Sequence, residues 1–132
     1  MELLVAVSIV GILASLALPQ YRKTVERSYW QSAQDILYTI HAGEEVYYRS
    51  QSGSPAYIIV TTAVPNWGAI YMDNPNAGSP PYPTRFSVPT ADATTFLAIA
   101  DRGDTRCMSI NQARDLVTDV APAGCTNAWP KP

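Results

Sequence analysis

The chain has 132 residues, of which 47% are hydrophobic and 15% charged, and its formal net charge is −2. A chain of this length builds about one domain with a single modest core. Because the net charge is slightly negative and Lys and Arg concentrate only at Arg22, Lys23 and Arg27, no specific nucleic-acid partner is expected.

Residues 3–18 carry no charge, and a single acid, Glu2, precedes them. As a helix this segment is about 24 Å long, slightly less than a bilayer span. It lacks the regularly spaced polar residues of a surface helix. A signal-peptide core, a buried central helix and a membrane anchor whose first turn lies upstream are the alternatives. The acidic start and the sequence after Leu18 disfavour a cleavable signal peptide.

The flanking charges and the cysteines give opposite indications about location. The positive-inside rule would place Arg22, Lys23 and Arg27 in the cytoplasm, and with them the rest of the chain. Cys107 and Cys125 are the only cysteines, and such a pair is typical of a disulfide in an oxidising compartment, although two free buried thiols are the alternative. We give the cysteines more weight, and expect basic residues ahead of Met1.

After Pro19 the apolar residues recur at steps of three and four, which predicts an amphipathic helix over 21–53. Its apolar stripe, expected to lie on the globular part, contains Tyr21, Val25, Tyr29, Ala33, Ile36, Leu37, Ile40 and Tyr47. Glu45 and Arg49 are spaced for an ion pair on its exposed side, and Gly53 and Pro55 end it.

Residues 54–132 are expected to form a head domain of β structure. Four short runs rich in β-branched and aromatic residues predict strands, at 56–62, 85–88, 94–100 and 106–110. The segment 73–83 has four prolines and is excluded as a central strand, whereas 111–120 fits either a short helix or a loop. The predicted fold is α+β: one long N-terminal helix packed on a small antiparallel sheet of about four strands.

No pattern of catalytic or metal-binding residues stands out, so neither enzyme activity nor a cofactor or metal is expected. His41 is the only histidine, and no glycine-rich phosphate loop or nucleophile motif occurs. Asp101, Asp104 and Asp115 lack the alternating oxygen ligands of a calcium loop. The aromatic residues of the helix, which are Tyr21, Tyr29, Trp30, Tyr38, Tyr47 and Tyr48, are better explained by packing than by electron conduction.

The stretch ELLVAVSIVGILASLALPQYRK, residues 2–23, resembles the N-terminal signature of bacterial type IV pilins and the related type II secretion pseudopilins. In that family a prepilin peptidase cuts after a glycine, the new N-terminus is an N-methylated phenylalanine, and a glutamate follows. Glu2 matches this glutamate, Gly11 the glycine within the helix and Pro19 the kinking proline. The sequence lacks the leader, the cleavage glycine and the phenylalanine, and Met1 stands where the family has an aliphatic residue.

The resemblance implies the pilin "lollipop" fold, in which 1–20 form a membrane and filament-core helix, 21–53 an amphipathic half and 54–132 a head with a C-terminal disulfide loop. It implies a filament subunit serving adhesion, motility or DNA uptake, held first in the inner membrane and later in the extracellular pilus. The implied partners are identical or related pilin subunits, the prepilin peptidase, a platform protein and an assembly ATPase.

Three residues would serve assembly. Glu2 would pair with the N-terminal ammonium of a neighbouring subunit, because a lone carboxylate in an apolar bundle needs a positive partner. Gly11 and Pro19 weaken the helix between them, so that it could bend or unwind on assembly. The alternatives are a type II secretion pseudopilin and a membrane-anchored binding domain that never polymerises. The cysteine pair near the C-terminus favours the pilin.

Overall fold

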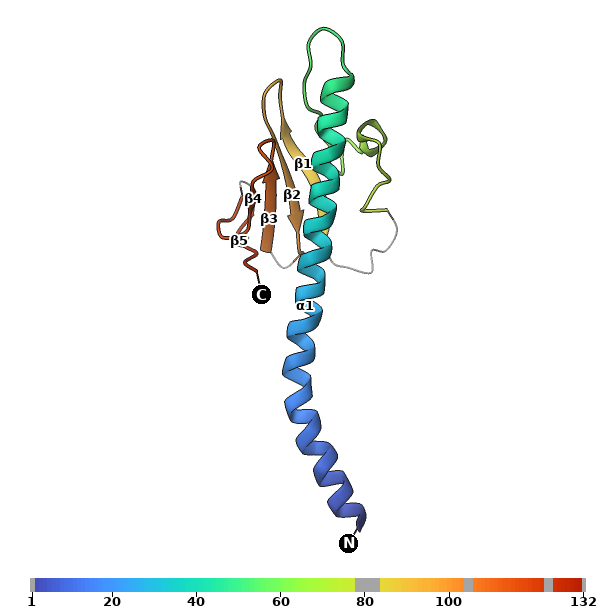
Figure 1. The fold of residues 1–132 in the computed structure, drawn as a ribbon, viewed down its shortest axis with the longest axis vertical. Helices are drawn as coiled ribbons and strands as arrows, with labels where there is room; N and C mark the ends of the chain where they lie inside the picture. Colours follow the sequence, from blue (N-terminus) through green and yellow to red (C-terminus); the bar gives the residue numbers. More distant parts are fainter. Residues whose placement is uncertain (1, 78–83, 104–105, 123–124, 132) are drawn as a thin grey trace.

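The protein consists of one long helix and a small sheet that packs against the C-terminal half of that helix (Figure 1). The computed structural model describes residues 2–77, 84–103, 106–122 and 125–131, except the side chain of Leu16. Helix α1 spans Glu2–Ser50. Its N-terminal half extends beyond the sheet, and the predicted α+β architecture is confirmed.

The apolar stripe of α1 packs on the sheet as its spacing predicts. Ala33, Leu37 and Ile40 are buried, and Tyr29, Ile36 and Tyr47 pack at the edge of the core. Tyr21 instead lies below the head and is 68% exposed. Its assignment to the buried stripe is wrong, because the head does not reach that far down the helix. Beyond Ser50 the chain turns at Gly53. Its φ is 113°, a conformation that glycine adopts readily and that is strained for other residues.

The sheet has the strand order β1-β2-β3-β4, with neighbouring strands antiparallel. Strand β5 also pairs with β3, in parallel. The bounds of the strands are Arg85–Ala91 (β1), Phe96–Asp101 (β2), Arg106–Asn111 (β3), Leu116–Val117 (β4) and Asn127–Ala128 (β5). Strand β2 begins two residues later than predicted, because the Asp92 carboxylate accepts the N–H groups of Thr94 and Thr95 in the preceding turn. These bonds lower the pKa of Asp92 to about 2.

The strand predicted over 56–62 is wrong, since only a single bridge forms there, between Val60 and Val88. One reason is that Ile58 donates its N–H to a Glu44 carboxylate oxygen, at 3.0 Å, and not to β1. Asn76 binds both main-chain groups of Phe86, at 2.8 Å each. The bridge and the Asn76 amide together cover part of the outer edge of β1, which limits its use by another chain.

The segment 111–120 is mostly a loop, one of the two predicted alternatives, and it contains no helix and only the short strand β4. Asn111 Oδ1 accepts the N–H groups of Ala113 and Asp115, and Arg114 adopts a φ of 66°. This side-chain turn reverses the chain, so that β4 pairs back onto β3. In the proline-rich segment, residues 73–77 contain no strand, in agreement with the prediction, and 78–83 lie outside the described residues.

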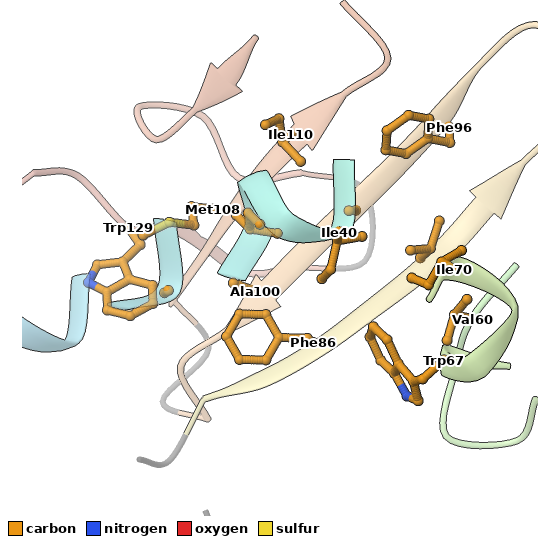
Figure 2. Close-up of a cluster of buried hydrophobic side chains, with 14 of the residues drawn as sticks. Ile40, Val60, Trp67, Ile70, Phe86, Phe96, Ala100, Met108, Ile110 and Trp129 are labelled. Atoms are coloured by element: carbon orange, nitrogen blue, oxygen red, sulfur yellow. The ribbon is translucent and has the colours of Figure 1, made fainter. Parts of the chain in front are cut away.

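The core lies between α1, the sheet and the loop that follows the helix. Figure 2 shows Ile40 of α1 among sheet residues such as Phe86 and Ala100, with Val60 and Ile70 of the loop nearby. The 3-10 helix η1, Trp67–Ile70, approaches α1 at Gly43, where a Cβ atom would collide with the Ile70 carbonyl oxygen. Gly43 therefore allows the loop to close over the helix.

The predicted disulfide is confirmed. Cys107 in β3 and Cys125 are joined by an S–S bond of 2.02 Å. The Trp129 N–H donates to the Cys107 carbonyl at 2.8 Å, so the C-terminal segment is attached to β3 both covalently and by hydrogen bonding. This attachment holds Trp129 in the core, where it is 1% exposed.

Glu44 is a completely buried acid on the core side of α1. One carboxylate oxygen accepts the Ile58 N–H, whereas Oε1 has no hydrogen-bond partner. Because burial disfavours the charged form, the pKa of Glu44 rises from 4.5 to about 7. The folded protein therefore holds this proton at pH values where the unfolded chain has released it.

This difference predicts that the protein loses stability as the pH rises from 4.5 to 7. Below pH 4.5 both states are protonated. Above it only the folded state keeps the proton, so the free energy of unfolding should fall by about 3 kcal/mol across this range. Urea unfolding at several pH values measures the slope. Glu44→Gln should remove it, and Asp35→Asn, which changes an exposed acid on the same helix, should retain it. An equal slope in Glu44→Gln would contradict the assignment.

Candidate functional site: the exposed half of the helix and its junction with the head

The N-terminal half of α1 presents apolar side chains all around its circumference. Leu3 is 78% exposed, Val10 65% and Leu18 59%, and the head covers none of them (Figure 1). The helix is long and apolar enough to cross a membrane. In water such a surface is strongly unfavourable, so the segment requires lipid or other apolar chains around it.

The two serine hydroxyls of this half are satisfied within the helix itself. Ser8 Oγ donates to the Leu4 carbonyl at 2.8 Å, and Ser15 Oγ to the Ile12 carbonyl at 2.7 Å. Neither hydroxyl then needs water, and the surface can be buried without unpaired donors.

The three predicted assembly residues all lie on this exposed half, and the structure does not bring them together. Glu2 is exposed in the first turn of α1, where a negative charge suits the helix dipole. The helix continues without interruption through Gly11 and Pro19, and a Cβ atom at Gly11 would meet nothing within 4 Å. Figure 1 shows this half curving away from the axis of the packed half. Pro19 supplies no N–H to the helix, and this weakens its backbone.

Just above the exposed half, an ionic cluster joins the helix to the head. Glu26 accepts from Arg102 at 2.9 Å, from Arg106 at 3.1 Å and from Trp129 Nε1 at 3.2 Å. One turn further along the helix, Trp30 Nε1 donates to the Trp129 carbonyl at 3.3 Å. We call Glu26, Arg102, Arg106 and Trp129 the junction cluster. Three separate segments of the head converge there on one helix residue.

Aromatic rings cover the central arginine of the cluster. The Arg102 guanidinium lies 4.2 Å from the centre of the Tyr29 ring and 5.7 Å from that of Trp129. Its Nε and Nη1 atoms have no hydrogen-bond partner, and the faces of the two rings shield them instead. The Arg102 side chain is only 11% exposed, so removing the Glu26 carboxylate would leave a poorly solvated positive charge, which costs more than breaking a surface ion pair.

The junction cluster does not follow from the sequence pattern. Glu26 and Arg102 are 76 positions apart, and no local spacing connects them. The available signal was the position of Glu26, one turn before the buried Trp30 and on the side of the helix that faces the head. An acid there has to find a partner from the sheet.

The remaining candidate residues have structural partners. His41 Nε2 lies 3.2 Å from the Gln112 carbonyl, and its ring packs near Phe96. Asp101 accepts the Gly103 N–H, and Asp115 contacts Asn111; Asp104 lies outside the described residues. Among the described residues no group of three or more His, Cys, Asp and Glu side chains could hold a metal ion.

The aromatic side chains of the helix pack at several separate places. Tyr48 stacks on Tyr57 with ring centres 4.6 Å apart, and Tyr38 lies beneath the Arg114 guanidinium.

Comparison with known proteins adds no further indication of function: no protein-family model matches the chain, and no curated protein is significantly similar to it.

The junction cluster predicts a large effect of a single substitution in the helix. Glu26→Gln removes the carboxylate that Arg102 and Arg106 share, and should lower the free energy of unfolding by about 2–3 kcal/mol. Arg49→Gln breaks only the exposed pair with Glu45, at 3.2 Å, and should cost about 0.5 kcal/mol or less. Urea unfolding of the full chain in detergent, followed by tryptophan fluorescence, compares the two. Equal losses in both variants would show that the cluster contributes no more than a surface pair.

Proposed function

We propose that this chain is the structural subunit of a type IV pilus filament, with the exposed half of α1 in the filament core and the head on the outside. The observation that carries the proposal is the exposed half itself: a complete apolar surface attached to a head that already has its own core. The pilin-like signature of residues 2–23 supports it.

A filament is the assembly that such a surface favours. The head sits on one end of the helix only, so apolar halves can bundle side by side while the heads remain outside (Figure 1). A contact repeated between different faces of identical chains generates a helical polymer whenever the rotation between neighbours does not close into a ring. The partial cover on the outer edge of β1 limits strand exchange along that edge.

Glu2 supplies specificity within this bundle. Its carboxylate would be surrounded by apolar helices, where an unpaired charge is costly. The N-terminal ammonium of a neighbouring subunit is the partner that the family resemblance implies. Such a pair forms at only one axial offset between two helices, so it would set the stagger of the subunits.

Before assembly, the same surface would hold the precursor in the inner membrane. The disulfide between Cys107 and Cys125 supports a location of the head on the oxidising side. Prepilin peptidase, a platform protein and an assembly ATPase are then the expected partners. A type II secretion pseudopilin would share these partners, and a binding domain that never polymerises would share only the membrane.

Glu2 separates a polymer from a simple anchor. In the source cells, Glu2→Gln should leave the protein in the membrane but reduce filaments more than tenfold, because an unpaired charge in an apolar bundle costs about 3–5 kcal/mol. Glu2→Asp keeps the charge and should retain part of the assembly. Electron microscopy of sheared filaments and membrane fractionation measure the two outcomes. Normal filaments in Glu2→Gln would contradict the proposal.

The segment between Gly11 and Pro19 should change on assembly. Once neighbouring subunits surround it, the missing Pro19 donor and the low helix propensity of Gly11 make unwinding inexpensive, with regular helix resuming near Tyr21. Pro19→Ala favours the helix by about 3 kcal/mol and should give straighter, stiffer filaments or fewer of them. Ser15→Ala leaves every backbone donor in place and should behave as the wild type. A filament map with unbroken helix from Leu3 to Ser50 would refute the expected unwinding.

A further inference from the structure

A polar hollow lies on the helix directly after the apolar segment. Its walls are Gln20, Lys23, Thr24 and Arg27, and its volume is about 240 Å³. These positions are spaced by three and four residues, so they share one face of α1. All four side chains are exposed. A phosphate group can therefore reach all four side chains from the outside.

The two cations of the hollow have no counter-charge in the described part of the chain. The ion pairs found there join Arg49 to Glu45 and Glu26 to the two arginines of the head, and none includes Lys23 or Arg27. Glu26, the nearest acid in sequence, is therefore already engaged. The hollow is left with an uncompensated positive charge directed to the outside.

The hollow lies at the level on the helix where the surface of a bilayer would be. From Glu2 to Lys23 the helix rises about 32 Å, close to the thickness of about 30 Å of a hydrocarbon core. With Glu2 at one surface, Lys23 lies at the other. Tyr21, which is 68% exposed, stands at the same level, where tyrosine is enriched in membrane proteins.

We propose that this hollow binds the phosphate of an anionic phospholipid, in the leaflet next to the head domain, while the helix spans the membrane. The inference rests on the membrane-anchored stage of the proposed function. Lys23 and Arg27 donate charge-assisted hydrogen bonds to the phosphate oxygens, and Arg27 can do so through two nitrogens. The Gln20 amide adds a donor. Thr24 Oγ1 already donates to the Gln20 carbonyl at 3.0 Å and shapes the wall. Two cations facing one phosphate favour a lipid with net negative charge over a zwitterionic one.

The test uses the full chain reconstituted in mixed vesicles of phosphatidylglycerol and phosphatidylcholine. Spin-labelled versions of each lipid measure how much of it is immobilised by the protein, and flotation of the vesicles measures insertion separately. The wild type should immobilise phosphatidylglycerol in preference to phosphatidylcholine. Lys23→Gln and Arg27→Gln should each reduce this preference about fivefold, and Arg27→Lys should largely keep it.

Arg22→Gln is the matched control, because Arg22 carries the same charge one residue away and does not line the hollow. It should reduce the preference much less than Lys23→Gln does. Equal reductions would mean a diffuse charge effect, and would overturn the site. No preference in an inserted wild type, or loss of the preference in excess inorganic phosphate, would also overturn it while leaving the anchor intact. A wild type that fails to insert would overturn both this inference and the membrane-anchored stage.

Discussion

The head domain is too small to cover its own helix, and the rest of the structure depends on this mismatch. Nine large apolar side chains between residues 3 and 18 are at least 52% exposed. Burying them is worth on the order of 10 kcal/mol, as much as the whole stability of a typical domain. No rearrangement within the chain could recover this energy, because the core is already filled by the other half of the helix. Burial of the exposed half, by lipid or by other chains, is therefore the largest gain in free energy that folding of the single chain leaves unrealised.

Lipid and a bundle of identical helices can both bury the apolar surface of the exposed half. They differ in what they require of its polar groups. In lipid the backbone must remain hydrogen-bonded internally, and Ser8 and Ser15 fit this demand by bonding to the carbonyls of the preceding turn. In a bundle the neighbouring helices replace the lipid, and the backbone near Pro19, which lacks one hydrogen-bond donor, is where the helix opens at the lowest cost. Glu2 has the opposite preference. It is tolerated at a membrane surface, and inside a bundle it requires a positive partner.

The parts of the fold that the sequence predicted are those determined by short spacings. The amphipathic stripe through Ala33, Leu37 and Ile40 and the strand 106–110 both follow from local periodicity. The disulfide followed from there being only two cysteines. The failures concern residues whose partners are distant. The segment 56–62 has strand-like residues, yet the buried Glu44 carboxylate takes its Ile58 N–H and prevents regular pairing.

The predicted assembly residues differ from the junction cluster in the same way. Glu2, Gly11 and Pro19 belong to one contiguous motif. The role of Glu26 depends on Arg102, Arg106 and Trp129, which are distant in sequence and meet it only in the folded head.

The junction cluster lies where α1 leaves the sheet, at the point where any force on the exposed half enters the head. Charge-assisted bonds resist bending there more than apolar contacts alone, because they hold only in a narrow range of geometry. Since the Cys107–Cys125 bond and the Trp129 N–H attach the C-terminal segment to β3, load carried by Glu26 passes into the centre of the sheet. A subunit that is held by its helix and pulled through its head would need this rigid connection between helix and sheet. A membrane anchor whose head rotates freely would not need it.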